Sequence, residues 1–213
     1  ERVDLMQAFT WSDGAPEPRL ACGIALCVAH RHAAASAAYL DTARTLGALA
    51  QSHPTSGPLR NRALSTAAGA LLSAGLPDAA LELVSNAGQI GGAASVARLH
   101  LLHTVGRSEE ALVEALRLLE QVAPWFRGSV YNQIGMIKLG DRQFDEAEEA
   151  FLNAQRRFTI TGDQLGEVAI EGNLAVLASR RGLRADAHAR FVRVARAWKA
   201  AGFPRREALA LAN

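Results

Sequence analysis

The sequence predicts an all-α fold, a right-handed α-solenoid of antiparallel helix pairs, and three observations lead to this prediction. Alanine and leucine are the commonest residues while aromatic residues make up only 6%, a composition typical of closely packed helices. Apolar residues recur at i, i+3, i+4 and i+7, without the β-branched alternation of a strand. A pattern of small and large residues also returns at intervals of roughly 30 to 40 residues, which indicates a helical repeat.

Proline and glycine mark the ends of the predicted helices. Because a missing N–H costs nothing in a first turn, four prolines fit predicted helix starts: Pro58, Pro77, Pro124 and Pro204. A left-handed glycine commonly closes a helix, and five glycines stand at predicted C-termini: Gly75, Gly106, Gly162, Gly182 and Gly202. We therefore expect helices over residues 18–32, 34–51, 58–74, 77–88, 92–105, 108–122, 125–139, 143–161, 164–181 and 183–201, and from 204 onward.

The second helices of successive pairs share one register. Small residues recur at Ala80, Ala111, Ala147 and Ala187. Four positions further on stand Val84, Ala115, Phe151 and Phe191, and seven further on stand Ala87, Leu118, Ala154 and Val194. Positions i, i+4 and i+7 share one helix face, so the small residue lets a partner helix approach and the larger residues fill the groove. One pair cannot bury its own apolar face, which predicts stacking of neighbouring pairs.

This spacing resembles the tetratricopeptide repeat (TPR), whose second helix carries an alanine, an aromatic residue four positions on and another alanine three beyond. The resemblance is closest over residues 129–161. There Gly135 stands where the repeat has its first-helix glycine, and Phe144 precedes the second-helix set of Ala147, Phe151 and Ala154.

The resemblance weakens outside that unit. In "NLAVLASRRG", residues 173–182, Ala175 replaces the glycine and Ala178 the usual tyrosine, and the first helices lack the signature tryptophan. The likeness covers residues 58–213 well and 18–57 loosely. It implies a single TPR-like repeat domain over residues 1–213, in which 1–57 form an N-terminal cap with the first helix pair and 58–213 form the repeats.

More narrowly, the final run "WKAAGFPRREALALAN" is similar to repeat arrays that precede CHAT (caspase-like) protease domains, and similar arrays occur in STAND and LuxR-type regulators of actinobacteria. This resemblance implies a scaffold or sensor module in a larger bacterial signalling or defence protein, located in the cytoplasm. We therefore expect the chain to be a piece of a longer protein.

No residue pattern indicates catalysis, and we expect no enzyme activity, no cofactor and no metal. The sequence contains no GxSxG, GxxxxGK or GxGxxG motif. Cys22 and Cys27 are spaced neither as a redox pair nor as metal ligands, and Cys27 is expected on an apolar face where a thiol is inert. The histidines at 30–32, and the pair His100 and His103, lack neighbouring ligands for zinc. No apolar run approaches the roughly eighteen residues of a membrane span, so no membrane partner is expected.

The first helices of a TPR-like array line its concave groove, and we predict that this groove binds a protein or peptide partner, including another domain of the same protein. The expected lining is small and largely apolar: Arg62, Ser65, Val96, His100, His103, Asn132, Met136, Leu139, Val176 and Ser179. Of these, only Asn132 fits the basic clamp with which chaperone-binding members of the family hold acidic tails. The occupant would therefore be an amphipathic helix or an extended apolar segment. If the register is shifted by one, the same residues pack against neighbouring helices instead.

A basic stripe supplies the alternative hypothesis. Arg190, Arg193 and Arg196 are spaced three apart and could contact phosphates, as in a transcription factor module or nucleic-acid-associated regulator. The net charge of +2 is too small to indicate such a partner by itself, and no aromatic residues interleave the arginines as stacking platforms. A self-assembling module is a further alternative, so the oligomeric state is left open.

Overall fold

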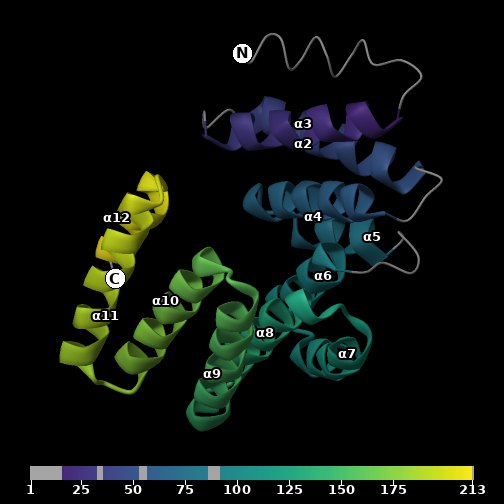
Figure 1. Cartoon of the computed structure of the whole chain (residues 1–213). Helices are drawn as coiled ribbons and strands as arrows, with labels where there is room; N and C mark the ends of the chain where they lie inside the picture. Colours follow the sequence, from purple (N-terminus) through teal and green to yellow (C-terminus); the bar gives the residue numbers. More distant parts are fainter. Residues whose placement is uncertain (1–15, 33–35, 53–56, 86–91, 213) are drawn as a thin grey trace. The chain divides into compact units, whose positions relative to one another are not determined.

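The computed structural model describes residues 16–32, 36–52, 57–85 and 92–212, and within them it contains helices and turns but no strand. The predicted all-α class is thereby confirmed (Figure 1). The helices follow one another as α2 (Pro16–His32), α3 (Ser36–Ser52), α4 (Pro58–Ser73), α5 (Pro77–Ser85), α6 (Ala93–Thr104), α7 (Ser108–Gln121), the 3₁₀ turn η1 (Pro124–Phe126), α8 (Arg127–Gly140), α9 (Phe144–Thr161), α10 (Gln164–Arg180), α11 (Arg184–Ala200) and α12 (Pro204–Ala212).

Each predicted helix has a counterpart in the described residues, with one notable shift. The helix expected from residue 125 begins at Arg127, because Pro124–Phe126 form a 3₁₀ turn in which the Phe126 N–H donates to the Ala123 carbonyl at 2.9 Å. Proline fixes its own φ and has no N–H to donate, so it suits this tight connection as well as it suits a first helical turn. The position of Pro124 correctly predicted that a helical turn starts there, but not that this turn is a 3₁₀ turn rather than an α-helix.

The chain divides into two compact units, one up to Glu114 and the other from Ala115. In the first unit, α2, α3 and α4 pack against one another, and α4 also contacts α5 and α6. Its core is built from leucines and alanines of these helices, including Leu20, Leu46, Leu64 and Ala67. In the second unit, α8 packs on α9, α9 on α10, α10 on α11 and α11 on α12. The prediction of a single domain over 1–213 stays a prediction.

Helices are joined by one recurring type of turn. Gly75, Gly106, Gly162, Gly182 and Gly202 all have positive φ, as expected for residues that close a helix. In each turn the next N–H donates back to a carbonyl five residues earlier, as from Leu76 to Leu71 at 3.0 Å and from Leu183 to Ala178 at 2.9 Å. These bonds give a donor to carbonyls that a helix end leaves unpaired, so the chain can reverse direction without unsatisfied carbonyl groups.

The turn between α8 and α9 departs from this rule in its residue type. Here Arg142, with φ of 60°, takes the left-handed position that glycine occupies in the other turns, although Gly140 stands two residues earlier. The hydrogen bonding is unchanged, since the Gln143 N–H donates to the Lys138 carbonyl at 2.9 Å. A left-handed arginine costs about 1 kcal/mol relative to glycine, so packing of the flanking helices, rather than local preference, fixes this turn.

The repeat register read from the sequence corresponds to buried positions. The recurring alanines Ala80, Ala111, Ala147 and Ala187 are all buried, as are the residues four positions further on. Of the third set, Leu118, Ala154 and Val194 are buried, while Ala87 lies outside the described residues. The whole described set is therefore buried, as expected for positions that face partner helices.

Glycines opposite phenylalanine rings set the close packing of the second unit. A Cβ placed on Gly135 of α8 would stand 2.5 Å from two ring atoms of Phe151 of α9, which is fully buried. A Cβ on Gly128 of α8 would stand 2.8 Å from Phe158, and one on Gly166 of α10 would stand 2.6 Å from the same ring. The rings therefore lie against bare backbone, and no other residue type fits at these positions without moving them.

We expect Gly135→Ala to destabilise the protein by about 1–3 kcal/mol, because the added methyl overpacks the Phe151 ring. The matched control is Gly172→Ala on α10, where a Cβ would stand an ordinary 3.7 Å from Val194. That change should be neutral or stabilise by about 0.5–1 kcal/mol, since alanine favours helix. Urea unfolding followed by circular dichroism measures both, and equal effects at the two sites would contradict the close-packing argument.

Candidate interaction surface

In the second unit, the predicted groove residues come from the first helices of two successive pairs. Asn132, Met136 and Leu139 lie on α8, and Val176 and Ser179 lie on α10. The two helices are joined on this face by a hydrogen bond, in which Asn173 Nδ2 donates to Asn132 Oδ1 at 2.7 Å. This bond links α8 to α10 next to the predicted residues, and their common lining of a groove stays a prediction. Asn173 was not among the residues predicted from the sequence.

The apolar members of this face are shared between surface and core. Met136 and Leu139 are half-buried and pack against the cluster that contains Phe151, Ile170 and Leu174. Val176 is also half-buried and packs against the cluster of Ala175, Ala178, Ala187 and Phe191. Ser179 is exposed. These residues therefore support the helix packing with one side while the other side remains accessible.

In the first unit, the predicted lining divides between α4 and α6. Arg62 is exposed and Ser65 half-buried on α4, and Val96, His100 and His103 are half-buried on α6. Helices α4 and α6 pack against each other. The continuous lining that the sequence predicts along all repeats stays a prediction.

The two histidines of α6 have different surroundings. The Nδ1 atom of His103 lies 3.0 Å from the Ser108 hydroxyl at the start of α7. Burial, and secondarily the nearby His103, lower the pKa of His100 below its ordinary value of 6.5. His100 therefore stays neutral over a wider pH range than an exposed histidine.

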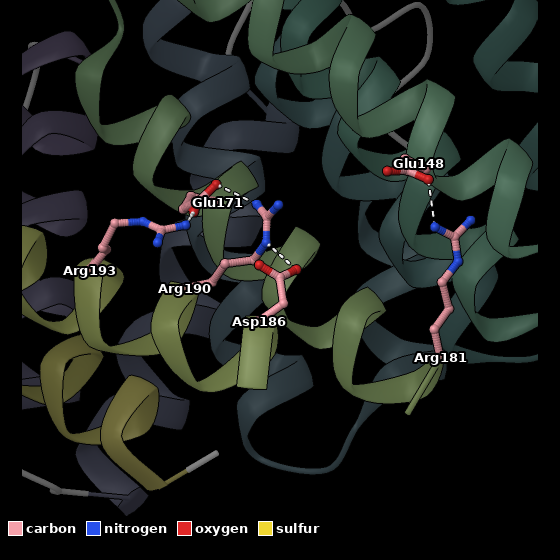
Figure 2. Close-up of polar contacts among 6 residues, drawn as sticks. All are labelled: Glu148, Glu171, Arg181, Asp186, Arg190 and Arg193. Carbon is pink, nitrogen blue, oxygen red and sulfur yellow. Dashed lines mark hydrogen bonds and ion pairs between the residues drawn. The ribbon is translucent and has the colours of Figure 1, made fainter. Parts of the chain in front are cut away.

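The predicted basic stripe on α11 is largely neutralised by acidic residues (Figure 2). Arg190 donates to Asp186 on its own helix at 2.9 Å and to Glu171 of α10 at 3.0 Å. Arg193 donates to the other oxygen of Glu171. Arg196 is exposed and forms no ion pair with any other described residue. Two of the three arginines are thus paired with carboxylates, although Arg193 remains exposed, and this pairing weakens the case for phosphate binding at the stripe.

Further ion pairs, none of them predicted from the sequence, connect helices in both units. Arg181, at the end of α10, donates to Glu148 and Asp145 of α9, each at 2.6 Å (Figure 2 shows the Glu148 contact). In the first unit, Arg98 of α6 pairs with both Glu110 and Glu114 of α7. Each arginine contacts two carboxylates that lie three or four positions apart on a neighbouring helix. Acidic residues at this spacing share one helix face, and this sequence pattern could have predicted the ion pairs.

The candidate metal ligands and cysteines of the described residues can be considered in turn. Among them, no three histidine, cysteine, aspartate or glutamate side chains gather closely enough to hold a metal ion. Cys27 is buried, and burial raises the pKa of its thiol to about 12, so it is not a nucleophile at neutral pH. The side chains of His30 and His32 lie outside the part of the chain that is described. Searching the described residues for a helix able to cross a membrane finds none.

Comparison with solved structures establishes the TPR-like repeat fold. The chain is similar to a Podosopora anserina protein described as a kinesin light chain with nearly identical TPR-like repeats, with a TM-score of 0.57 and 15% identity over 86% of this chain and 96% of that one. A single-residue variant of that protein gives a TM-score of 0.58 and 14% identity over 88% and 97% of the two chains. The sequence matches no protein-family profile and no curated protein. At this identity the likeness shows the fold alone, that of a TPR-like helical repeat protein.

Lowering the pH is expected to destabilise the protein through His100. Its pKa is about 6.5 when unfolded and lower when folded. Between these two pKa values the unfolded chain binds more protons than the folded chain, so the free energy of unfolding rises with pH. The stability that His100 contributes is therefore lost as the pH falls from about 6.5 toward the folded-state pKa. Urea unfolding between pH 7.5 and pH 5 should therefore show a shallower pH dependence for His100→Gln than for the natural protein. Identical slopes would contradict this assignment.

Releasing the arginines of α11 should increase affinity for polyanions. We expect Glu171→Gln to be retained longer on heparin than the natural protein, because Arg190 and Arg193 lose their shared carboxylate. Glu149→Gln on α9 is the control, since it makes the same change in net charge at an exposed position. Equal retention of the two variants would mean that total charge, and not the pairing with Glu171, sets polyanion binding.

Proposed function

We propose that the chain is a non-catalytic protein-interaction scaffold that binds a peptide or helix of a partner on the α8–α10 face, defined by Asn132, Met136, Leu139, Asn173 and Val176. The observation that carries the proposal is the composition of this face, where half-buried apolar side chains lie on the same two helices as a hydrogen-bonded amide pair. Such a mixture of apolar contact and a few placed polar groups is typical of recognition surfaces. Stacked helical repeats commonly use the surface lined by their first helices in this way.

The setting of the module is proposed from sequence resemblance alone. Its similarity to arrays beside CHAT, STAND and LuxR-type domains favours a sensing or scaffolding part of a larger bacterial signalling or defence protein in the cytoplasm. The partner would then be another protein or an effector domain of the same polypeptide. Extending the reading frame beyond Asn213 tests this setting directly, because it shows which domain, if any, follows.

The alternative of a nucleic-acid-associated regulator has less support. Its strongest sequence feature was the arginine stripe, and two of those three arginines form ion pairs with Glu171 and Asp186. The ion pairs leave the α11 surface close to neutral around Arg190 and Arg193 rather than basic. The protein-interaction proposal therefore agrees better with the arrangement of charges.

Charge substitutions on the α8–α10 face test the proposal. A random dodecapeptide display library is selected on the full chain, and the recovered peptides are measured by fluorescence anisotropy. Met136→Lys and Val176→Lys should each weaken binding at least about tenfold, because a charge enters an apolar contact. Leu152→Lys, an equivalent change at an exposed position of α9, should leave the affinity unchanged. Undiminished binding by both face variants would rule out this surface.

A further inference from the structure

A hollow in the second unit is lined by residues of the second helices α9 and α11 and of α10, which packs against both. It encloses about 280 Å³, part of which is open to solvent. Its lining combines apolar and charged side chains: Leu174, Leu177, Ala178, Leu183, Glu148, Asp186, Arg181 and Arg190. None of the residues that define the α8–α10 face lines this α9–α11 hollow. The hollow is therefore a separate candidate site.

The apolar part of the lining comes from α10 and the turn that follows it. Leu174, Leu177 and Ala178 are spaced three and four positions apart, so they share one face of α10, and all three are buried. Leu183, in the turn before α11, is 53% exposed although it is a large apolar residue. A ligand that covers this leucine removes apolar surface from water, which favours binding. The lining therefore suits a ligand with an apolar part.

The carboxylates of the hollow are more accessible than its arginines. The side chains of Glu148 and Asp186 are 44% and 48% exposed, whereas those of Arg181 and Arg190 are 24% and 27% exposed. Each carboxylate accepts from an arginine through one oxygen, Glu148 from Arg181 at 2.6 Å and Asp186 from Arg190 at 2.9 Å (Figure 2). Within the described residues, the second oxygen of each carboxylate accepts no hydrogen bond. The carboxylates can therefore accept hydrogen bonds from a ligand.

Both arginines are further neutralised by carboxylates outside the lining. Arg181 also donates to Asp145, and Arg190 also donates to Glu171, which is shared with Arg193. The two groups together hold four carboxylates and three guanidinium groups, and thus a net charge of −1. This excess of negative charge favours a cation over an anion at the hollow.

We propose that the α9–α11 hollow binds an alkylammonium group, whose nitrogen donates to the carboxylates of the lining and whose methylene groups lie against its leucines. An ammonium has three N–H donors and no acceptor, which matches ionised carboxylates that only accept. Free amines and lysine side chains both present this group. The site is independent of the proposed peptide binding on the α8–α10 face, so either proposal can fail without the other.

Titrations followed by the backbone amide NMR shifts of the full chain test this inference, with butylammonium chloride as the probe and ionic strength held constant with sodium chloride. We expect saturable shifts that include residues of the lining. Methylammonium lacks the apolar stem and butyrate carries the opposite charge, so each should bind at least about fivefold more weakly. Butyrate that binds as tightly as butylammonium, or the absence of saturable shifts with butylammonium, would overturn the proposal.

Glu148→Gln and Asp145→Asn form a matched pair of variants. Each removes one carboxylate from Arg181, leaves it the other, and changes the net charge equally, but only Glu148 lines the hollow, while the Asp145 side chain is 99% exposed. We expect Glu148→Gln to weaken butylammonium binding about threefold or more and Asp145→Asn to change it little. Leu183→Ala should reduce the preference for butylammonium over methylammonium. Thermal unfolding establishes that each variant is folded, and equal weakening by Glu148→Gln and Asp145→Asn would refute the site.

Competition with Nα-acetyl-lysine N-methylamide distinguishes the two sources of the group. This compound presents the ammonium on a lysine side chain between two amides, as a protein does. If it displaces butylammonium at a comparable concentration, the site is assigned to a lysine of a partner protein. If butylammonium binds and the lysine derivative does not, the flanking amides are excluded and the site is assigned to a free alkylamine.

Discussion

The packing of the second unit depends on two phenylalanine rings that lie against backbone without side chains. Phe158 of α9 is in contact range of Gly128 on α8 and Gly166 on α10, so a single ring sets how closely both first helices approach the second helix between them. Phe151 lies in the same way against Gly135 of α8, one residue before Met136. The spacing that results allows Asn132 and Asn173 to come within 2.7 Å. The candidate surface on α8 and α10 therefore depends on a steric constraint within the helix packing.

Much of the fold could be predicted because its determinants are local. Proline and glycine placed the helix ends, and the recurring alanines located the buried faces, since both signals act within one or two helical turns. Arg142 shows where this reasoning stops. A glycine rule favours Gly140 as the left-handed residue, but the packed helices on either side place the reversal two residues later. The conformational preference of single residues does not show where packing of the flanking helices outweighs it.

The candidate site was harder to predict because its chemistry depends on residues far apart in the chain. The arginines of α11 form an apparently basic stripe when that helix is considered alone, and only the fold brings Glu171 of α10 against two of them. Asn173 gave no signal in the sequence, because an amide becomes informative only when another amide, here Asn132, faces it. The interhelical ion pairs are partly exposed and contribute little stability individually.

The uniform turns have a consequence for how such a chain can grow. The reversals after α8 and α10 end in equivalent hydrogen bonds, from Gln143 to Lys138 and from Leu183 to Ala178. Each also leads into its next helix in the same way, with Ala147 and Ala187 donating to the carbonyls of Gln143 and Leu183 at 2.9 Å. The segment from Gln143 to Gly182 thus begins and ends at turns with equivalent hydrogen bonds, which are its two joints. A tandem copy of it could be spliced in at either joint without a new kind of connection, which makes unequal recombination a simple route to arrays of different length.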